Sequence, residues 1–262
     1  METVMSFNQP TAPAMSRRRV IGAYLEEARS ECLRYMRAPS FMLPIMLFPG
    51  LFYLFFGVLM ARTEGADAAR YLLASYGTFG VMSPGLFGFG VSLALERDGG
   101  LLTFKRALPM PPGAYLLGKM LMAMVAAGVV ILLLLTMAVT LGHVALSPLQ
   151  AGALMLTGML GVLPFCALGM FVGTVVKGQG APGMLQLVYM PMSIMSGLWF
   201  PLPMLPKFLQ QIAPVWPSYH LDMVAMAAVG LNKEAILTHV LVLLGFAVGF
   251  LLLAVRRLRR NG

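Results

Sequence analysis

Long apolar stretches dominate this chain from residue 40 almost to its end. Six segments are apolar and free of Asp, Glu, Lys and Arg: 40–61, 72–95, 120–141, 150–176, 181–200 and 235–255. Each has at least the ~20 residues that an α-helix needs to cross the roughly 30 Å hydrocarbon core of a bilayer. Only helices and closed barrels satisfy their backbone polar groups in that environment. The pattern therefore predicts an all-α membrane protein with six transmembrane helices.

The segment before the first span has a different pattern. Residues 1–16 are rich in Pro, Ser, Thr and Met, which is typical of a disordered N-terminus. From Val20 to Met36, apolar residues recur at helical spacing with charged residues between them. We expect an amphipathic helix over 17–38, ended near Pro39, on the inner membrane surface. Two interpretations stay open: the helix is an interfacial anchor, or it also contacts a cytoplasmic partner.

The connection between the second and third spans, residues 96–119, mixes apolar and basic side chains. Its central part reads Leu101, Leu102, Thr103, Phe104, Lys105 and Arg106. A short helix between Gly100 and Pro109 fits this segment. Apolar residues presented away from lipid need a protein to cover them, so the segment is a candidate contact surface for a partner.

The connection between the fifth and sixth spans, residues 201–234, is largely apolar but interrupted by proline. Four prolines divide it: Pro203, Pro206, Pro214 and Pro217. The resulting pieces of about 10 residues are too short to cross a membrane. We expect two short re-entrant helices in the outer leaflet.

Charge sets the orientation. The chain is 59% hydrophobic and 11% charged, with a net charge of +9. With the N-terminus inside and alternating spans, 15 of the 19 Lys and Arg residues lie on the cytoplasmic side. This distribution follows the positive-inside rule and places both termini in the cytoplasm. It also accounts for the basic excess without a nucleic-acid partner. The cytoplasmic charges would meet the anionic headgroups of the lipid bilayer or an acidic partner surface.

Motifs for chemistry are sparse. The sequence has no Gly-x-x-x-x-Gly-Lys-Ser/Thr loop, so we expect no nucleotide or other cofactor in this chain. His143, His220 and His239 show no metal-ligand spacing, and Cys32 and Cys166 are not expected to pair. The 23 methionines allow three interpretations: Cu(I) ligation, adaptable packing or a greasy substrate surface. Because the spans offer no ionisable side chain except His239, an ion-driven mechanism lacks support.

Two glycine pairs have the spacing that lets membrane helices approach closely. They are Gly169 with Gly173 in the fourth span and Gly245 with Gly249 in the sixth. Such pairs serve contacts within the chain or between two chains. Packing within the chain is the interpretation that we favour for both pairs.

Three features together resemble the ABC-2 family of ATP-binding-cassette permeases. The first is the amphipathic helix before span one. The second is the stretch from Glu96 through Gly99-Gly100-Leu101-Leu102 to Leu108-Pro109, with Gly118-Lys119 further on. The third is Ser196-Gly197-Leu198-Trp199-Phe200-Pro201, followed by Pro206 and by Ala213-Pro214. Leu101 replaces the threonine that the family has at this position, so this sequence departs from the pattern there. The resemblance extends over 17–258.

The resemblance implies a six-span transmembrane domain over 39–258 in a bacterial cytoplasmic (inner) membrane. The chain would be a non-enzymatic permease that pairs with a second copy and docks two separate ATPase subunits, which bind ATP and Mg²⁺. It would export a hydrophobic or amphipathic substrate: a drug, a lipid or a lipid-linked glycan. The implied coupling residues are Glu96, Arg97, Leu101, Leu102, Phe104, Lys105 and Arg106. The implied outer gate residues are Gly197, Phe200, Pro201, Pro206 and Pro214. The alternatives are an ATP-independent secondary carrier or channel, and an intramembrane enzyme or assembly factor.

Overall fold

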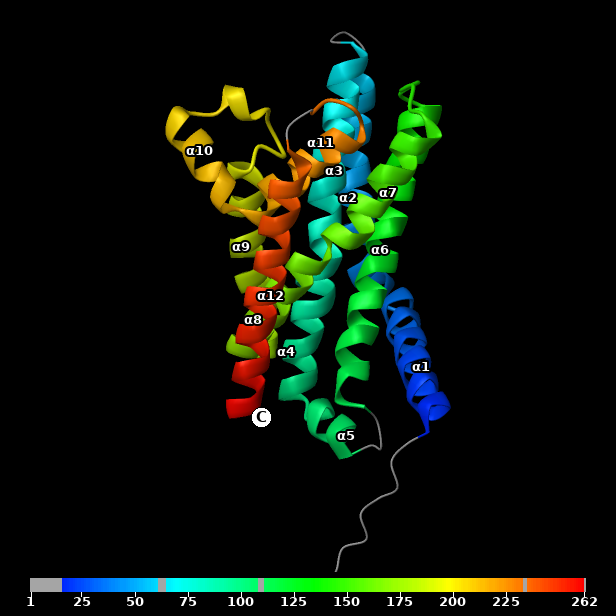
Figure 1. Cartoon of the computed structure of the whole chain (residues 1–262), viewed down its shortest axis with the longest axis vertical. Coiled ribbons are helices and arrows are strands. Elements are labelled where there is room, and N and C mark those ends of the chain that lie inside the picture. Colours follow the sequence, from blue (N-terminus) through cyan, green and yellow to red (C-terminus); the bar gives the residue numbers. More distant parts are fainter. Residues whose placement is uncertain (1–15, 61–64, 108–110, 233–234, 262) are drawn as a thin grey trace, which may run out of the picture.

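The computed structural model describes residues 16–60, 65–107, 111–232 and 235–261, and its regular structure in these ranges is helical. The helices form an elongated bundle (Figure 1). The α-helices are α1 (Arg17–Met36), α2 (Pro39–Phe52), α3 (Ala66–Ser83), α4 (Gly90–Asp98), α5 (Leu101–Ala107), α6 (Pro112–Thr140), α7 (Pro148–Gly161), α8 (Leu163–Val175), α9 (Ala181–Met195), α10 (Lys207–Ile212), α11 (Pro217–Ala228) and α12 (Ile236–Asn261). Two π-helical segments, Tyr53–Met60 and Pro84–Phe89, continue α2 and α3, and 3₁₀ turns lie at Gly178–Gly180, Leu202–Met204 and Ala213–Val215.

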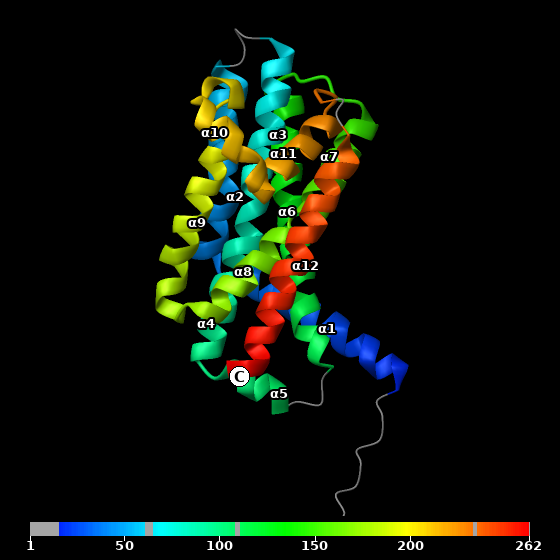
Figure 2. The same cartoon turned by 60° about the vertical axis from the view of Figure 1, so that its left-hand side comes forward.

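The two ends of the bundle differ in what they carry. We call the end that holds α5 and the C-terminal end of α12 the base (Figures 1 and 2). The opposite end, which holds α10, is the top. The prediction that the base faces the cytoplasm rests on the charge distribution.

Five helical stretches among the described residues are long and apolar enough to cross a membrane. They are Met42–Met60, Asp67–Asp98, Gly113–Thr140, Pro148–Val175 and Ile236–Leu258. They correspond to the first four predicted spans and to the sixth. The chain is thus a multi-pass helical membrane protein.

The fifth predicted span, 181–200, is not a full-length helix. It contains α9, whose 15 residues rise only about 22 Å at 1.5 Å per residue. Gly197, at φ +83°, ends α9 in a Schellman motif: its N–H donates to Ile194 and the Leu198 N–H donates to Ser193. Helix α9 still runs from the base toward α10 (Figure 2), but six membrane-crossing helices are not confirmed.

The predicted loop 96–119 is shorter than expected. Glu96 belongs to α4, which ends at Asp98, and Lys119 lies two turns into α6, which begins at Pro112. Between them, the short helix expected after Gly100 is confirmed as α5. The polar residues at both ends of this stretch suggested a loop, but they extend the two membrane helices because they find buried partners.

Helix α1 leans against α6 near the base (Figure 1), but it does not bury its apolar residues. Ile21, Leu25 and Met36 are exposed, whereas Glu31 and Tyr35 are buried. The contact face of α1 thus includes an acidic residue, and the amphipathic interpretation is not confirmed by the packing.

The first glycine pair packs inside the chain, as predicted. A Cβ atom on Gly169 would lie 2.8 Å from the Gly85 carbonyl oxygen, and one on Gly173 would lie 2.6 Å from that of Gly90. Glycine therefore lets α8 approach the π-helical segment and α4. The second pair differs, because a Cβ atom on Gly245 or Gly249 would meet no atom within 4 Å. Internal packing does not explain that pair.

Candidate functional site

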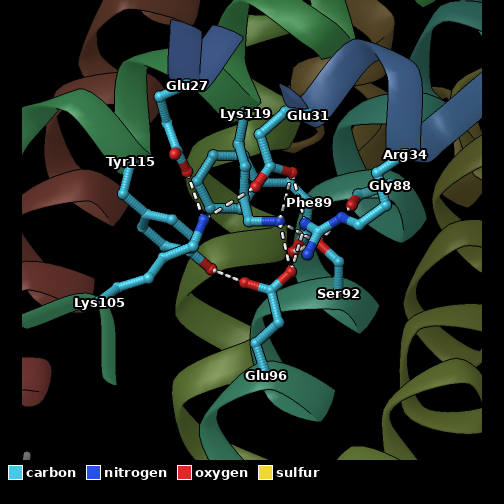
Figure 3. A network of polar contacts seen from close by, with 10 residues as sticks. All are labelled: Glu27, Glu31, Arg34, Gly88, Phe89, Ser92, Glu96, Lys105, Tyr115 and Lys119. Atoms are coloured by element: carbon cyan, nitrogen blue, oxygen red, sulfur yellow. Dashed lines mark hydrogen bonds and ion pairs between the residues drawn. The ribbon is translucent and has the colours of Figure 1, made fainter. Parts of the chain in front are cut away.

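Four helices meet in a cluster of charged side chains near the base (Figure 3). Helices α1, α4 and α6 each contribute residues three or four positions apart, which share one helix face, and α5 contributes a single lysine. The cluster comprises Glu27, Glu31 and Arg34 of α1, Ser92 and Glu96 of α4, Lys105 of α5, and Tyr115 and Lys119 of α6. We call this group the base network.

Lys119 lies at the centre of the base network and is 0% exposed. Its Nζ lies 3.0 Å from Glu31 Oε2, 2.9 Å from Glu96 Oε1 and 2.8 Å from Ser92 Oγ. The three N–H groups of the ammonium thus all have acceptors. A buried lysine is tolerable only with such partners, since an unpaired buried charge is strongly destabilising.

Arg34 and Lys105 attach α1 to α4 and α5. Arg34 pairs with both Glu31 and Glu96. Lys105 pairs with Glu27 and lies 3.2 Å from Glu31 Oε1. The base network therefore connects four helices that the sequence separates by up to 88 positions.

Tyr115 completes the contacts. Its hydroxyl donates to Glu96 Oε2 at 2.6 Å. The ammonium groups of Lys105 and Lys119 lie 4.6 Å and 5.1 Å from the centre of its ring, within the range of cation–π attraction. The ring thus lies close to both lysines and orients the carboxylate of Glu96.

The charges of the base network balance. The carboxylates of Glu27, Glu31 and Glu96 face the three cations of Arg34, Lys105 and Lys119. Burial alone would raise the pKa of Glu31, but Lys119 and Arg34 hold it below its ordinary value. Glu31 is therefore ionised at neutral pH.

The structure places the predicted coupling residues in two groups. Glu96 is buried and Lys105 is half-buried in the base network, so both charges are satisfied within the chain. On α5, Leu102 packs against the core, Leu101 is half-buried and Phe104 is 62% exposed. The side chain of Arg106 lies outside the described residues. Phe104 is thus the large apolar group that α5 presents outward.

Arg97 has a separate internal role. Its guanidinium donates to the carbonyl oxygens of Gly173 at 3.0 Å and Val176 at 2.9 Å, at the end of α8. Next to it, Asp98 Oδ2 accepts from the Gly178 N–H at 2.6 Å. These two residues cap α8 and join α4 to the turn that precedes α9.

Three of the predicted outer gate residues lie close together at the top. Tyr71 donates to the Gly197 carbonyl at 3.1 Å. Phe200 and Pro201 line a cavity of about 530 Å³. Its other walls combine aliphatic residues with the aromatic side chains of Phe56, Tyr71, Tyr76 and Trp199. Pro206 and Pro214 flank α10 instead.

Sequence reasoning missed two polar groups near the top. His220 of α11 and His239 of α12 are in contact, with 2.9 Å between their Nδ1 atoms. His220 Nε2 donates to the Pro214 carbonyl at 2.8 Å. Asp222 is 1% exposed and lies 3.5 Å from the Ser75 hydroxyl of α3. These residues are far apart in sequence, so periodicity alone could not pair them.

A further apolar cleft of about 310 Å³ lies between α2, α9 and the middle of the α3–α4 stretch. Phe48, Phe87 and Tyr189 are among its walls, and Gln186 and Ser83 supply polar atoms. The Ser83 hydroxyl donates to Tyr189 at 2.9 Å. The cleft therefore combines aromatic surface with a few polar groups.

The comparisons with known proteins agree with this architecture. A family model described as "ABC-2 family transporter protein" matches residues 58–256. The chain is 28% identical over 232 residues to a Bacillus subtilis (strain 168) protein named "Putative transport permease YvfS", covering 87% of this chain and 94% of that protein. The matched region holds most of the membrane-spanning helices, α5 and the short helices at the top. The chain belongs to the ABC-2 family of transporter proteins, as a membrane component.

Proposed function

We propose that this chain is the permease subunit of an ABC exporter, acting as a pair of identical copies with two separate ATPase subunits. The observation that carries the proposal is the base network, which connects helix α5 to α1, α4 and α6 through ion pairs centred on the buried Lys119. The ATPase subunits bind ATP and Mg²⁺ and dock on α5 and α1.

The construction of the base supports a docking role. Phe104 projects from α5, while Lys105 on the same helix pairs with Glu27 and Glu31 of α1. A displacement of α5 is therefore transmitted to α1 directly, and to α4 and α6 through the ion pairs of Glu31, Lys119 and Glu96. Packed networks of this kind move as units between discrete arrangements. ATP-driven closure of the ATPase pair moves this unit and opens an outward path between the two copies.

The substrate is apolar or amphipathic. The two cavities are lined mainly by aromatic and aliphatic side chains, with Gln186 and Ser83 as polar atoms in the middle cleft. Such walls suit a drug, a lipid or a lipid-linked glycan better than a small ion. The cleft beside α2 and α9 faces the second copy and forms part of the path, with the aromatic cavity at the top as its exit.

The orientation follows from charge. Arg256, Arg257 and Arg260 at the end of α12 and the arginines of α1 support a base that faces the cytoplasm, by the positive-inside rule. Both termini are cytoplasmic, and α9 with the rest of the predicted span 181–200 makes the fifth crossing in chain order. Helices α10 and α11 dip into the outer leaflet.

Co-purification tests this proposal. The chain is expressed with the ATPase encoded beside it, extracted in mild detergent, and analysed for complex mass and ATP hydrolysis. We expect a complex of two permeases and two ATPases that hydrolyses ATP. A folded chain that does not bind this ATPase, or transport in liposomes driven by an ion gradient without any ATPase, would instead indicate a secondary carrier or channel.

A further inference from the structure

The sixth membrane helix carries an open apolar groove. Its volume is about 430 Å³, and it is lined by Val242, Gly245, Phe246, Gly249, Phe250 and Leu253. The rings of Phe246 and Phe250 stack with their centres 6.0 Å apart and form one wall. Phe250 is supported from behind by Phe171 of α8, at 5.7 Å. Because added Cβ atoms on both glycines would meet open space, none of the residues that the structure describes fills the groove.

The groove faces away from the bundle. Helix α12 packs on α8 and α11, and Leu243 and Ala254 are buried. Of the five membrane-crossing stretches, α12 has the smallest buried share. The groove therefore opens toward the surrounding bilayer.

Three arginines continue the lining of the groove in helical register. Arg256, Arg257 and Arg260 follow Leu253 by three, four and seven positions, so they extend the same helix face toward the base. All three residues are exposed. One face of α12 thus carries the apolar groove and, nearer the base, a cluster of positive charges.

The dimensions fit one leaflet. From Val242 to Leu253 the helix rises about 17 Å at 1.5 Å per residue. Half of the roughly 30 Å hydrocarbon core is about 15 Å. A chain lying in the groove therefore reaches from the arginines to about the bilayer midplane, which matches an acyl chain whose headgroup lies at the base.

We propose that this face of α12 binds an anionic phospholipid, with one acyl chain along Gly245 and Gly249 and the phosphate on Arg256, Arg257 and Arg260. Guanidinium groups bind phosphate oxygens through paired, charge-assisted hydrogen bonds. An anionic phospholipid contacts both the apolar groove and the arginines, whereas a neutral lipid would fit only the groove.

Charge also decides between a lipid and a second copy of the chain. Two copies meeting through this face about an axis along the membrane normal would bring their arginine clusters together. Like charges at such a contact oppose association. Charge complementarity therefore favours the anionic lipid.

Native mass spectrometry of the purified full-length chain tests the proposal, with phosphatidylglycerol and phosphatidylcholine of identical acyl chains as probes. We expect wild type to retain phosphatidylglycerol about tenfold better, because each arginine near a lipid surface adds a favourable electrostatic contribution. Gly249→Leu fills the groove without a clash and should abolish most of that preference. Val248→Leu, on the neighbouring exposed face, is the matched control and should leave the preference unchanged.

Charge variants separate the two halves of the site. Replacing Arg256, Arg257 and Arg260 with Gln should abolish the preference, and replacing them with Lys should retain part of it. Three results would overturn the proposal. The first is that wild type shows no preference for phosphatidylglycerol. The second is that Gly249→Leu keeps the preference, which would indicate headgroup attraction alone. The third is that Gly249→Leu keeps the preference and also converts a two-chain species to single chains, which would indicate that the groove binds a second copy. None of these readouts requires an ATPase, so they are independent of the proposed function.

Discussion

Lys119 shows how a single residue depends on its surroundings. The sequence presents it as one more cytoplasmic charge after a glycine, yet it is completely buried and bound by Glu31, Glu96 and Ser92. The sequence pattern predicts that charged residues lie near one end of the bundle, because these residues separate the apolar runs. It could not predict their pairing, because Glu31 and Lys119 meet only after α1 has packed against α6.

Lys119→Met should destabilise the protein by about 3–5 kcal/mol, because it leaves two buried carboxylates without their central cation. Thermal unfolding of the detergent-solubilised protein measures this loss. Adding Glu96→Gln to Lys119→Met removes one of the orphaned charges and should recover part of the stability. A single variant that melts with wild type would show that the ion pairs contribute no net stability.

His220 should make the contact between α11 and α12 sensitive to acid. Burial lowers the pKa of His220 below its ordinary 6.5, so the folded state binds fewer protons there than the unfolded state. Its contribution to stability is therefore full above pH 6.5 and falls as the pH drops below that value. Asp222 on the same helix acts with the opposite sign, because burial raises its pKa.

Comparison with a variant isolates the His220 contribution. Between pH 7.5 and 5.5, the melting temperature of wild type should fall more than that of His220→Gln, in which Asp222 is retained. Glu31 does not interfere, since Lys119 and Arg34 hold its pKa below the ordinary value of a glutamate, outside this pH range. Equal falls in both proteins would contradict a role for His220 in this contact.

Among the helices, α9 is the one whose structure differs most from the prediction based on sequence. The apolar run 181–200 has the length of a span, so hydropathy predicts a full crossing. Hydropathy does not register Gly197 or Pro201, although glycine and proline are residue types that commonly end helices. In the structure, the left-handed conformation of Gly197 ends the helix and turns the chain toward the cavity at the top.

Gly197→Ala should therefore cost about 1–2 kcal/mol, because a side chain disfavours the left-handed conformation that Gly197 adopts. Gly183→Ala is the matched control, since it lies within α9 and an added Cβ atom meets no atom within 4 Å. Thermal unfolding should show a loss for the first variant and no loss for the second. Equal stability of the two variants would contradict the assigned turn.

Across the whole molecule, one long helix joins the two candidate functional ends. The stretch Asp67–Asp98 contains α3, the π-helical segment and α4, and its 32 residues span about 48 Å at 1.5 Å per residue. Tyr71 and Tyr76 line the cavity at the top, and Ser92 and Glu96 belong to the base network. We therefore expect a displacement of the base network to be transmitted along this helix to the proposed exit for substrate.

The most direct test of this coupling compares Phe104→Ala with Phe208→Ala in liposomes that contain the chain and its ATPase. Phe104 on α5 is 62% exposed, and Phe208 on α10 at the opposite end is 59% exposed. We expect Phe104→Ala to weaken ATPase binding by about tenfold, as loss of an interface anchor worth about 1.4 kcal/mol would do, and to lower transport per ATP hydrolysed, whereas Phe208→Ala should leave both quantities unchanged. Unchanged transport per ATP in Phe104→Ala would contradict docking through α5.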